Sequence, residues 1–226
     1  MNIEAKARIQ SGLVVYCKLM DMFQKVDVSK DADFQRMYDG FYRVRRNASW
    51  RKIYFDYFQT VKNSNITFRD IITYMYKAKG SVEASFSSKM LATINPDMPI
   101  WDQFVLKKLG IEQKYYYANK EQQLEDAIVN YDKIVEWYKN QATDEYIKEF
   151  DANFPDYKHI TATKKVDWLL WGIRDEDDNE SSRKDVTALI DKEIKKIMSI
   201  VDNNEMSDGE IGATIEALED LIKYIS

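Results

Sequence analysis

Glycine and proline are scarce in this chain, which has seven glycines and three prolines among its 226 residues. Antiparallel sandwiches and barrels need many tight turns, and these two residue types supply the backbone conformations of such turns. Large apolar side chains are plentiful, since 45% of the residues are hydrophobic and 15 of them are tyrosines. The sequence therefore predicts an all-α protein with an aromatic core.

Apolar residues recur at helical spacing along most of the chain. Within residues 3–26 they are three or four positions apart and form one stripe, made of Ile9, Leu13, Tyr16, Met20 and Phe23. We expect further helices over residues 33–46, 50–61, 68–79, 83–93, 103–109, 120–140, 143–150 and 162–173. Together these segments form a main globular domain, residues 1–174.

Several of the predicted helices have recognisable end signals. Thr67 and Asp70 have the spacing of a capping box, and Gly80 follows the last residue of that helix. Pro96 ends the next helix, because proline cannot continue one. Asp102 stands where it can cap the helix that follows. The middle of the chain therefore has the local pattern of a helix, a turn and a second, capped helix.

The chain changes character after the main domain. Residues 175–183 combine a run of acidic side chains with asparagine and serine and contain no apolar residue, which indicates a linker. Residues 184–226 then carry two apolar stripes, and Ser207 with Glu210 gives a capping box between them. We expect a helical hairpin there, which binds a protein partner or self-associates.

Cysteine and histidine each occur once, as Cys17 and His159. They provide neither an internal disulfide nor a Cys/His set for zinc, so we expect no metal and no other cofactor. Charged residues interrupt the first helix, and no apolar run approaches the length of a membrane span. A cytoplasmic location without membrane contact is the resulting expectation.

The formal net charge of -5, with a pI near 5.2, argues against a protein whose whole surface binds nucleic acid. The acidic residues are concentrated towards the C-terminus, so any DNA footprint must lie in the first half of the chain. The densest basic stretch is there and consists of Arg43, Arg45, Arg46, Arg51 and Lys52. These side chains suit either phosphate contacts or the solvated face of an amphipathic helix.

Residues 80–110 read GSVEASFSSKMLATINPDMPIWDQFVLKKLG. A lysine lies early in one helix, a Pro-Ile-Trp-Asp turn follows, and an aspartate opens the next helix. In this layout the segment resembles the centre of the helix-hairpin-helix DNA glycosylase superfamily, and most closely its 8-oxoguanine glycosylase branch. The resemblance implies that fold for the main domain, with Lys89 as the nucleophilic lysine and Asp102 as the catalytic aspartate, and a modified or damaged DNA base as the target.

Each implied role has a chemical requirement. A carboxylate stabilises the oxocarbenium-like state in which the glycosidic bond breaks. An amine can attack the sugar C1′ and form a Schiff base that permits strand cleavage, provided that burial or neighbouring groups lower its pKa. The base must also leave the stack and enter a pocket. The pocket residues we expect are Trp101, Phe104, Tyr42, Ser87 and Ser88, and the expected phosphate contacts are Arg43, Arg45 and Arg46.

Plainer interpretations of the same residues stay open. Lys89 also suits a solvated helix lysine, and Asp102 suits an N-cap. Residues 85–88 stand where the superfamily has a glycine-rich hairpin, yet they contain no glycine. The alternative is therefore a non-enzymatic protein-interaction module on the same fold, and either function is compatible with a host–phage conflict system.

Overall fold

A computed structural model describes residues 1–111, 119–141 and 144–172. The chain divides into two units after Ile173, and all described residues belong to the first unit. The acidic linker and the helical hairpin predicted for residues 175–226 lie outside the described residues. Within the described ranges every regular element is helical, which confirms the all-α prediction.

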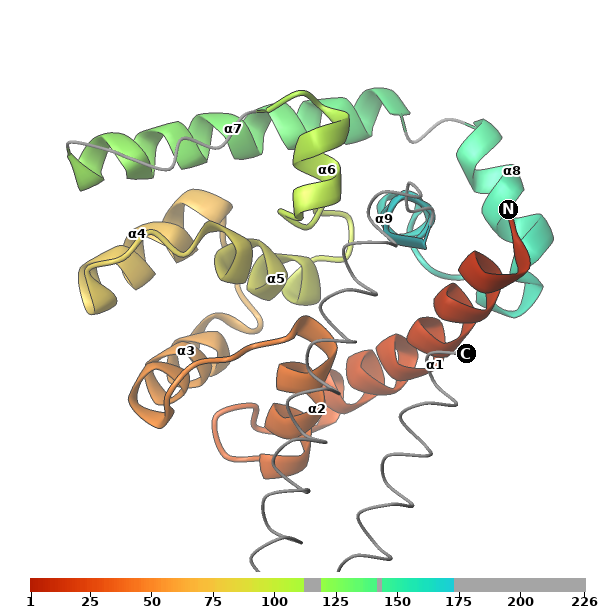
Figure 1. The fold of residues 1–226 in the computed structure, drawn as a ribbon. Helices are drawn as coiled ribbons and strands as arrows, with labels where there is room; N and C mark the ends of the chain where they lie inside the picture. Colours follow the sequence, from red (N-terminus) through yellow and green to blue (C-terminus); the bar gives the residue numbers. More distant parts are fainter. Residues whose placement is uncertain (112–118, 142–143, 173–226) are drawn as a thin grey trace, which may run out of the picture. The chain divides into compact units, whose positions relative to one another are not determined.

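The described helices follow one another along the chain as Figure 1 shows. Their bounds are α1 Ile3–Lys25, α2 Ala32–Tyr42, α3 Ala48–Val61, α4 Phe68–Lys79, α5 Ala84–Ile94, α6 Gln103–Lys108, α7 Lys120–Gln141, α8 Asp144–Asn153 and α9 Ala162–Gly172, with a 3-10 turn at Pro155–Tyr157 between the last two. None of these helices combines the length and the apolarity needed to cross a bilayer.

Helix α4 has the ends that the sequence predicts. The side chains and backbone amides of Thr67 and Asp70 form a complete capping box. Gly80 follows the helix in the left-handed conformation, with a φ of 68°, and its amide donates to the carbonyl oxygen of Tyr76. Both ends are fixed by contacts within a few residues, so the sequence alone locates them.

Helix α2 ends earlier than predicted. The sequence pattern extends that helix to Arg46, but Arg43 adopts a left-handed conformation with a φ of 53° and ends it. The amide of Val44 then donates to the carbonyl oxygen of Asp39 at 2.9 Å, and the Val44 side chain is buried. This is the bonding pattern of a Schellman motif, in which arginine takes the position that glycine usually occupies. Residues 43–46 therefore form a loop and not a helical face.

Helices α4 and α5 pack against each other as a hairpin. The turn between them consists of residues 80–83 and contains one glycine, Gly80. Residues 85–88, which the resemblance places at the hairpin, lie instead within the first turns of α5. The resemblance therefore places the turn several residues too late in the sequence. Gly80 ends α4, and α5 begins at Ala84 without a side-chain cap.

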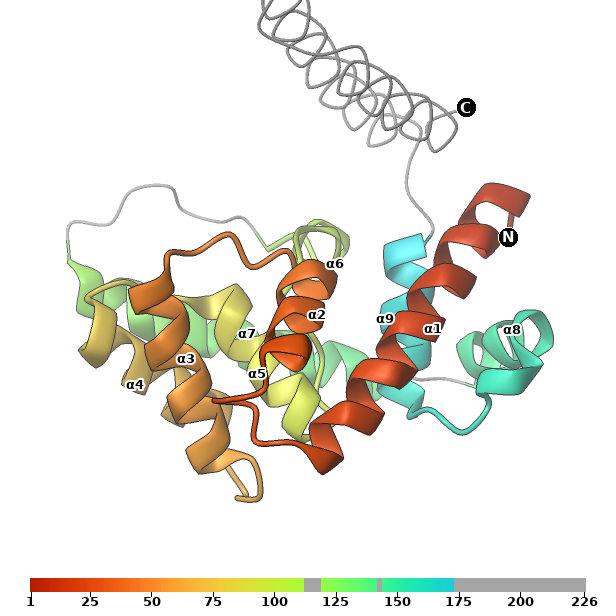
Figure 2. The ribbon, with the colours of Figure 1, turned by 90° about the horizontal axis from the view of Figure 1, so that it is seen from below.

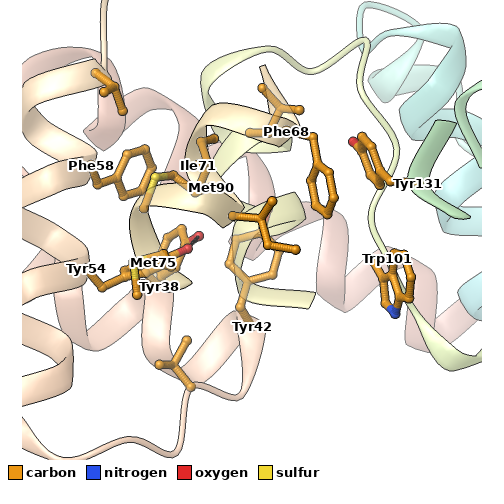
Figure 3. Packing of buried hydrophobic residues seen from close by; sticks show 14 of the residues in the cluster. Tyr38, Tyr42, Tyr54, Phe58, Phe68, Ile71, Met75, Met90, Trp101 and Tyr131 are labelled. Atoms are coloured by element: carbon orange, nitrogen blue, oxygen red, sulfur yellow. Dashed lines mark hydrogen bonds between the residues drawn. The ribbon is translucent and has the colours of Figure 1, made fainter. Parts of the chain in front are cut away.

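An aromatic core connects α2, α3, α4, α5 and α7 (Figure 3). Tyr38 and Tyr54 are fully buried, and their hydroxyl oxygens are 2.7 Å apart. The Tyr54 hydroxyl also donates to the carbonyl oxygen of Phe86 at 2.9 Å. Buried hydroxyls require such partners, so these hydrogen bonds fix the position of the start of α5 relative to α2 and α3.

A second cluster joins α1, α8 and α9, which lie side by side (Figure 2). Helices α1 and α9 approach closely at two glycines. A Cβ added to Gly12 would lie 2.6 Å from the Trp168 ring, and one added to Gly172 would lie 2.2 Å from the Ile9 side chain. Both glycines are therefore needed for packing at this crossing and not for a turn.

Candidate lysine–aspartate site

Lys89 lies on the second turn of α5 and points towards the loop that follows α2. Its Nζ donates to the carbonyl oxygen of Tyr42 at 3.3 Å and lies 5.1 Å from the centroid of the Phe86 ring. The side chain is half-buried. Lys89 is thus not the fully solvated lysine that its residue type would suggest.

The surroundings of Lys89 favour its neutral amine. Burial lowers the pKa of Lys89, because the charged form loses hydration. The Asp102 carboxylate opposes that effect, and the Arg43 guanidinium adds to it. Lys89 and Asp102 therefore lie within electrostatic range of each other.

A buried serine holds the segment that carries Asp102. The backbone amide of Trp101 donates to the Ser88 Oγ at 2.9 Å, and the Ser88 hydroxyl donates to the carbonyl oxygen of Ser85. On the other side, the Tyr131 hydroxyl donates to the carbonyl oxygen of Pro99 at 2.8 Å. The turn between α5 and α6 is thus fixed to both α5 and α7, so Asp102 has a defined position beside α5.

The loop between α2 and α3 brings positive charge to the same place. Arg43, Arg45 and Arg46 are all exposed. The Arg46 guanidinium pairs with the buried carboxylate of Glu83 at 2.8 Å and lies 5.2 Å from the Phe86 ring centroid. The Arg46 charge is therefore paired within the protein, whereas Arg43 lies close enough to Lys89 to lower its pKa.

The other two basic residues of this stretch also form ion pairs. Arg51 pairs with Asp39 at 2.5 Å, and Lys52 pairs with Asp56 at 2.7 Å one turn further along α3. The Lys52 pair is exposed and fits a charged helix face, whereas the Arg51 pair is partly buried and joins α3 to α2.

A pocket of about 260 Å³ opens beside this site at the start of α5. Its walls are Arg46, Val82, Glu83, Ala84, Ser85, Phe86, Trp101, Gln123, Ala127 and Asn130. Trp101, predicted to bind the substrate, is one of them. The contributions of Phe86, Gln123 and Asn130 were not predicted. Those of Gln123 and Asn130 depend on the fold, in which α7 and the start of α5 line the same pocket.

The other predicted pocket residues lie elsewhere. Tyr42 is buried and its hydroxyl is 3.3 Å from the Thr93 Oγ1, so its contribution to the lysine is its backbone carbonyl. Ser87 and Ser88 are fully buried and do not line the pocket. Phe104 belongs to α6, and its side chain is outside the described part of the structure.

A second lysine–carboxylate pair lies deeper, on α9. Lys164, whose side chain is 3% exposed, forms an ion pair with Asp167 on the next turn of the same helix. The Tyr138 hydroxyl donates to the same carboxylate at 2.5 Å. Burial, together with the Asp167 carboxylate, raises the pKa of Tyr138 well above its usual value. The sequence interpretation gave this pair no role.

Among the described side chains, no group of three or more His, Cys, Asp or Glu residues is placed to hold a metal ion. No protein-family model, curated protein or solved structure matches the chain. Any functional conclusion therefore depends on the geometry of the site and on its chemistry.

Proposed function

We propose that the protein is a DNA-glycosylase-like enzyme in which Lys89 forms a Schiff base with deoxyribose and Asp102 assists departure of the base. One observation carries the proposal: a half-buried lysine with a lowered pKa lies within electrostatic range of an aspartate from a separate segment. Such a pairing of desolvation with a specific charged partner is characteristic of reactive sites.

The chemistry needs both groups in a defined order. As the C1′–N bond breaks, the base leaves with the bonding electrons, and the Asp102 carboxylate stabilises positive charge on the sugar. The neutral Lys89 amine then bonds to C1′ and gives up one proton to the departed base anion. The ring C1′–O4′ bond opens, O4′ keeps the bonding electrons and takes a proton from water, and Nζ and C1′ form a protonated imine. Loss of a proton from C2′ expels the 3′ phosphate and cuts the strand.

The surroundings of the lysine suit an anionic backbone. Arg43 and Arg45 are exposed on the loop next to Lys89, so we assign to them the contacts with DNA phosphates. The protein as a whole is acidic, with a formal net charge of -5. Binding to DNA is therefore expected to be local and strongly weakened by salt.

Borohydride trapping tests the proposal. A duplex with a single abasic site presents an aldehyde at C1′, and attack by an amine forms an imine with loss of water; borohydride reduces that imine to a stable covalent link. We expect wild-type protein to form the adduct, Lys89→Gln to lose it, and Asp102→Asn to retain it on abasic DNA while losing release of a damaged base. Lys52→Gln is the matched control, because Lys52 is an exposed lysine on the neighbouring helix.

An adduct that persists in Lys89→Gln would assign the chemistry to another amine and contradict the proposal. Absence of any adduct, together with absence of salt-sensitive DNA binding, would favour the non-enzymatic interaction module. For that module the partner surface predicted on residues 184–226 lies outside the described residues.

A further inference from the structure

The pocket at the start of α5 contains two amide side chains from one face of α7. Gln123, Ala127 and Asn130 are separated by four and three positions, so they lie in one row along the helix. The small Ala127 between the two amides keeps the space between them open. Phe86 and Trp101 supply the aromatic walls on the opposite elements.

The electrostatics of this pocket favour a neutral ligand. Arg46 lines it, but the Glu83 carboxylate, which is 6% exposed, neutralises that charge at a distance of 2.8 Å. A free phosphate or carboxylate would have to compete with Glu83 for the guanidinium. A net cation would find only one carboxylate, and that one is already paired.

Hydrogen-bonding capacity excludes a purely apolar ligand. The side-chain amide of Gln123 makes no hydrogen bond within the part of the chain that the structure describes. The Asn130 Oδ1 accepts from the Lys133 Nζ at 3.2 Å, which leaves the N–H donors of Asn130. An aliphatic ligand would remove these groups from water without replacing the lost hydrogen bonds. A flat ring with donors and acceptors on its edge satisfies both the aromatic walls and the amides.

We infer that this pocket binds a nucleobase, with Phe86 and Trp101 against its faces and with Gln123 and Asn130 as the residues that read its hydrogen-bonding edge. The identification of the ring as a base rests on the proposed function. Trp101 directly precedes Asp102, and Phe86 lies one helical turn before Lys89, so a base held here adjoins the reactive pair.

Binding of free bases tests the inference without any reaction. Saturation-transfer NMR on the full chain is run with adenine, hypoxanthine, cytosine, uracil and 3-methyladenine as probes. We expect signal transfer to at least one of them, with affinity lowered about tenfold in Gln123→Leu and in Asn130→Leu because a lost hydrogen bond leaves a polar edge unpaired. Gln122→Leu is the matched control, since Gln122 has the same side chain, is exposed and does not line the pocket.

The outcomes separate this inference from the proposed function. No transfer to any probe in the wild type, or equal affinity in Gln123→Leu and Gln122→Leu, overturns the pocket assignment. Trapping on an abasic site requires no bound base, so in the wild type it tests the Schiff-base function separately from base binding. Base binding without any borohydride adduct would support the pocket assignment and contradict the Schiff-base function. An adduct without base binding would support the Schiff-base function and contradict the pocket assignment.

Discussion

Lys89 and Lys164 both lie partly or wholly inside the fold with an aspartate nearby, and their surroundings differ. Lys164 is paired directly with Asp167 on the same helix and is almost completely shielded from solvent. Lys89 is half-buried, its amine donates to a backbone carbonyl, and its aspartate comes from a separate turn. The first arrangement satisfies a charge internally, whereas the second leaves the lysine side chain partly exposed.

The charge of Lys164 is satisfied within the fold, whereas Lys89 is the lysine to which the proposed function assigns a reaction. A buried ion pair with an additional hydrogen bond, as at Lys164, Asp167 and Tyr138, has its polar groups engaged. A nucleophilic amine instead needs a lowered pKa and an approach path. At Lys89, burial and the Arg43 guanidinium lower the pKa of the amine.

Breaking the two pairs should therefore have unequal consequences for stability. Asp167→Leu leaves the Lys164 charge buried without a partner, and we expect it to lower the free energy of unfolding by about 3 to 5 kcal/mol. Asp102→Asn retains a residue that caps helices equally well, and we expect a loss below about 1 kcal/mol. Urea denaturation followed by circular dichroism at pH 7 measures both.

A double variant identifies the cause of the larger loss. Lys164→Met combined with Asp167→Leu removes the stranded charge, so it should recover much of the stability lost in Asp167→Leu alone. If the double variant were no more stable than the single one, the loss would come from packing or from the Tyr138 hydroxyl and not from the ion pair.

Chemical labelling should separate the lysines by rate. Acetic anhydride reacts with neutral, accessible amines, and Lys164 becomes accessible only when the structure opens. We expect Lys89 to be acetylated more than about a hundredfold faster than Lys164 in the native protein, as measured by peptide mass spectrometry. Relative to the exposed Lys52, labelling of Lys89 should begin at lower pH, because burial lowers the pKa of Lys89. Comparable rates for Lys89 and Lys164 would remove the distinction between them.

The sequence predicted those features that depend on near neighbours. The capping box of Thr67 and the stop at Gly80 are local, and both were located correctly. The end of α2 was missed because an arginine in the left-handed conformation leaves no composition signal. In that case the tertiary burial of Val44 determines the helix end.

The candidate site was only partly predictable for the same reason. Lys89 and Asp102 were selected from a sequence pattern, but their proximity depends on the Ser88 hydroxyl, which bonds to the Trp101 amide across the turn. The burial of Lys164 contradicts the usual preference of lysine for solvent. Its partner, three positions along the helix, is visible in the sequence, but the shielding of the pair depends on how α9 packs in the fold.

Replacing the Lys89 amine tests how the stability contributed by this lysine depends on pH. Lys89→Met keeps the approximate volume and removes a partly desolvated charge, so we expect the free energy of unfolding at pH 7 to change by less than about 1.5 kcal/mol. The folded pKa of Lys89 lies below its unfolded value, so the protonated form reduces stability. As the pH rises from the folded pKa towards the unfolded one, the wild type should gain stability relative to Lys89→Met. A difference that does not vary between pH 7 and pH 10 would show that Lys89 titrates as a solvated lysine.

The smallest effect expected is also the most specific one, because two neighbours should move the titration of Lys89 in opposite directions. Asp102 favours the charged amine, so Asp102→Asn should shift the onset of Lys89 acetylation to lower pH. Arg43 disfavours it, so Arg43→Gln should shift the onset to higher pH, while a non-glycine residue stays at the same left-handed backbone position. The onset for Lys52 serves as the internal reference in each variant. Shifts of the same sign in both variants would mean that the substitutions change access to the amine, and the charges of Asp102 and Arg43 would then not control its reactivity.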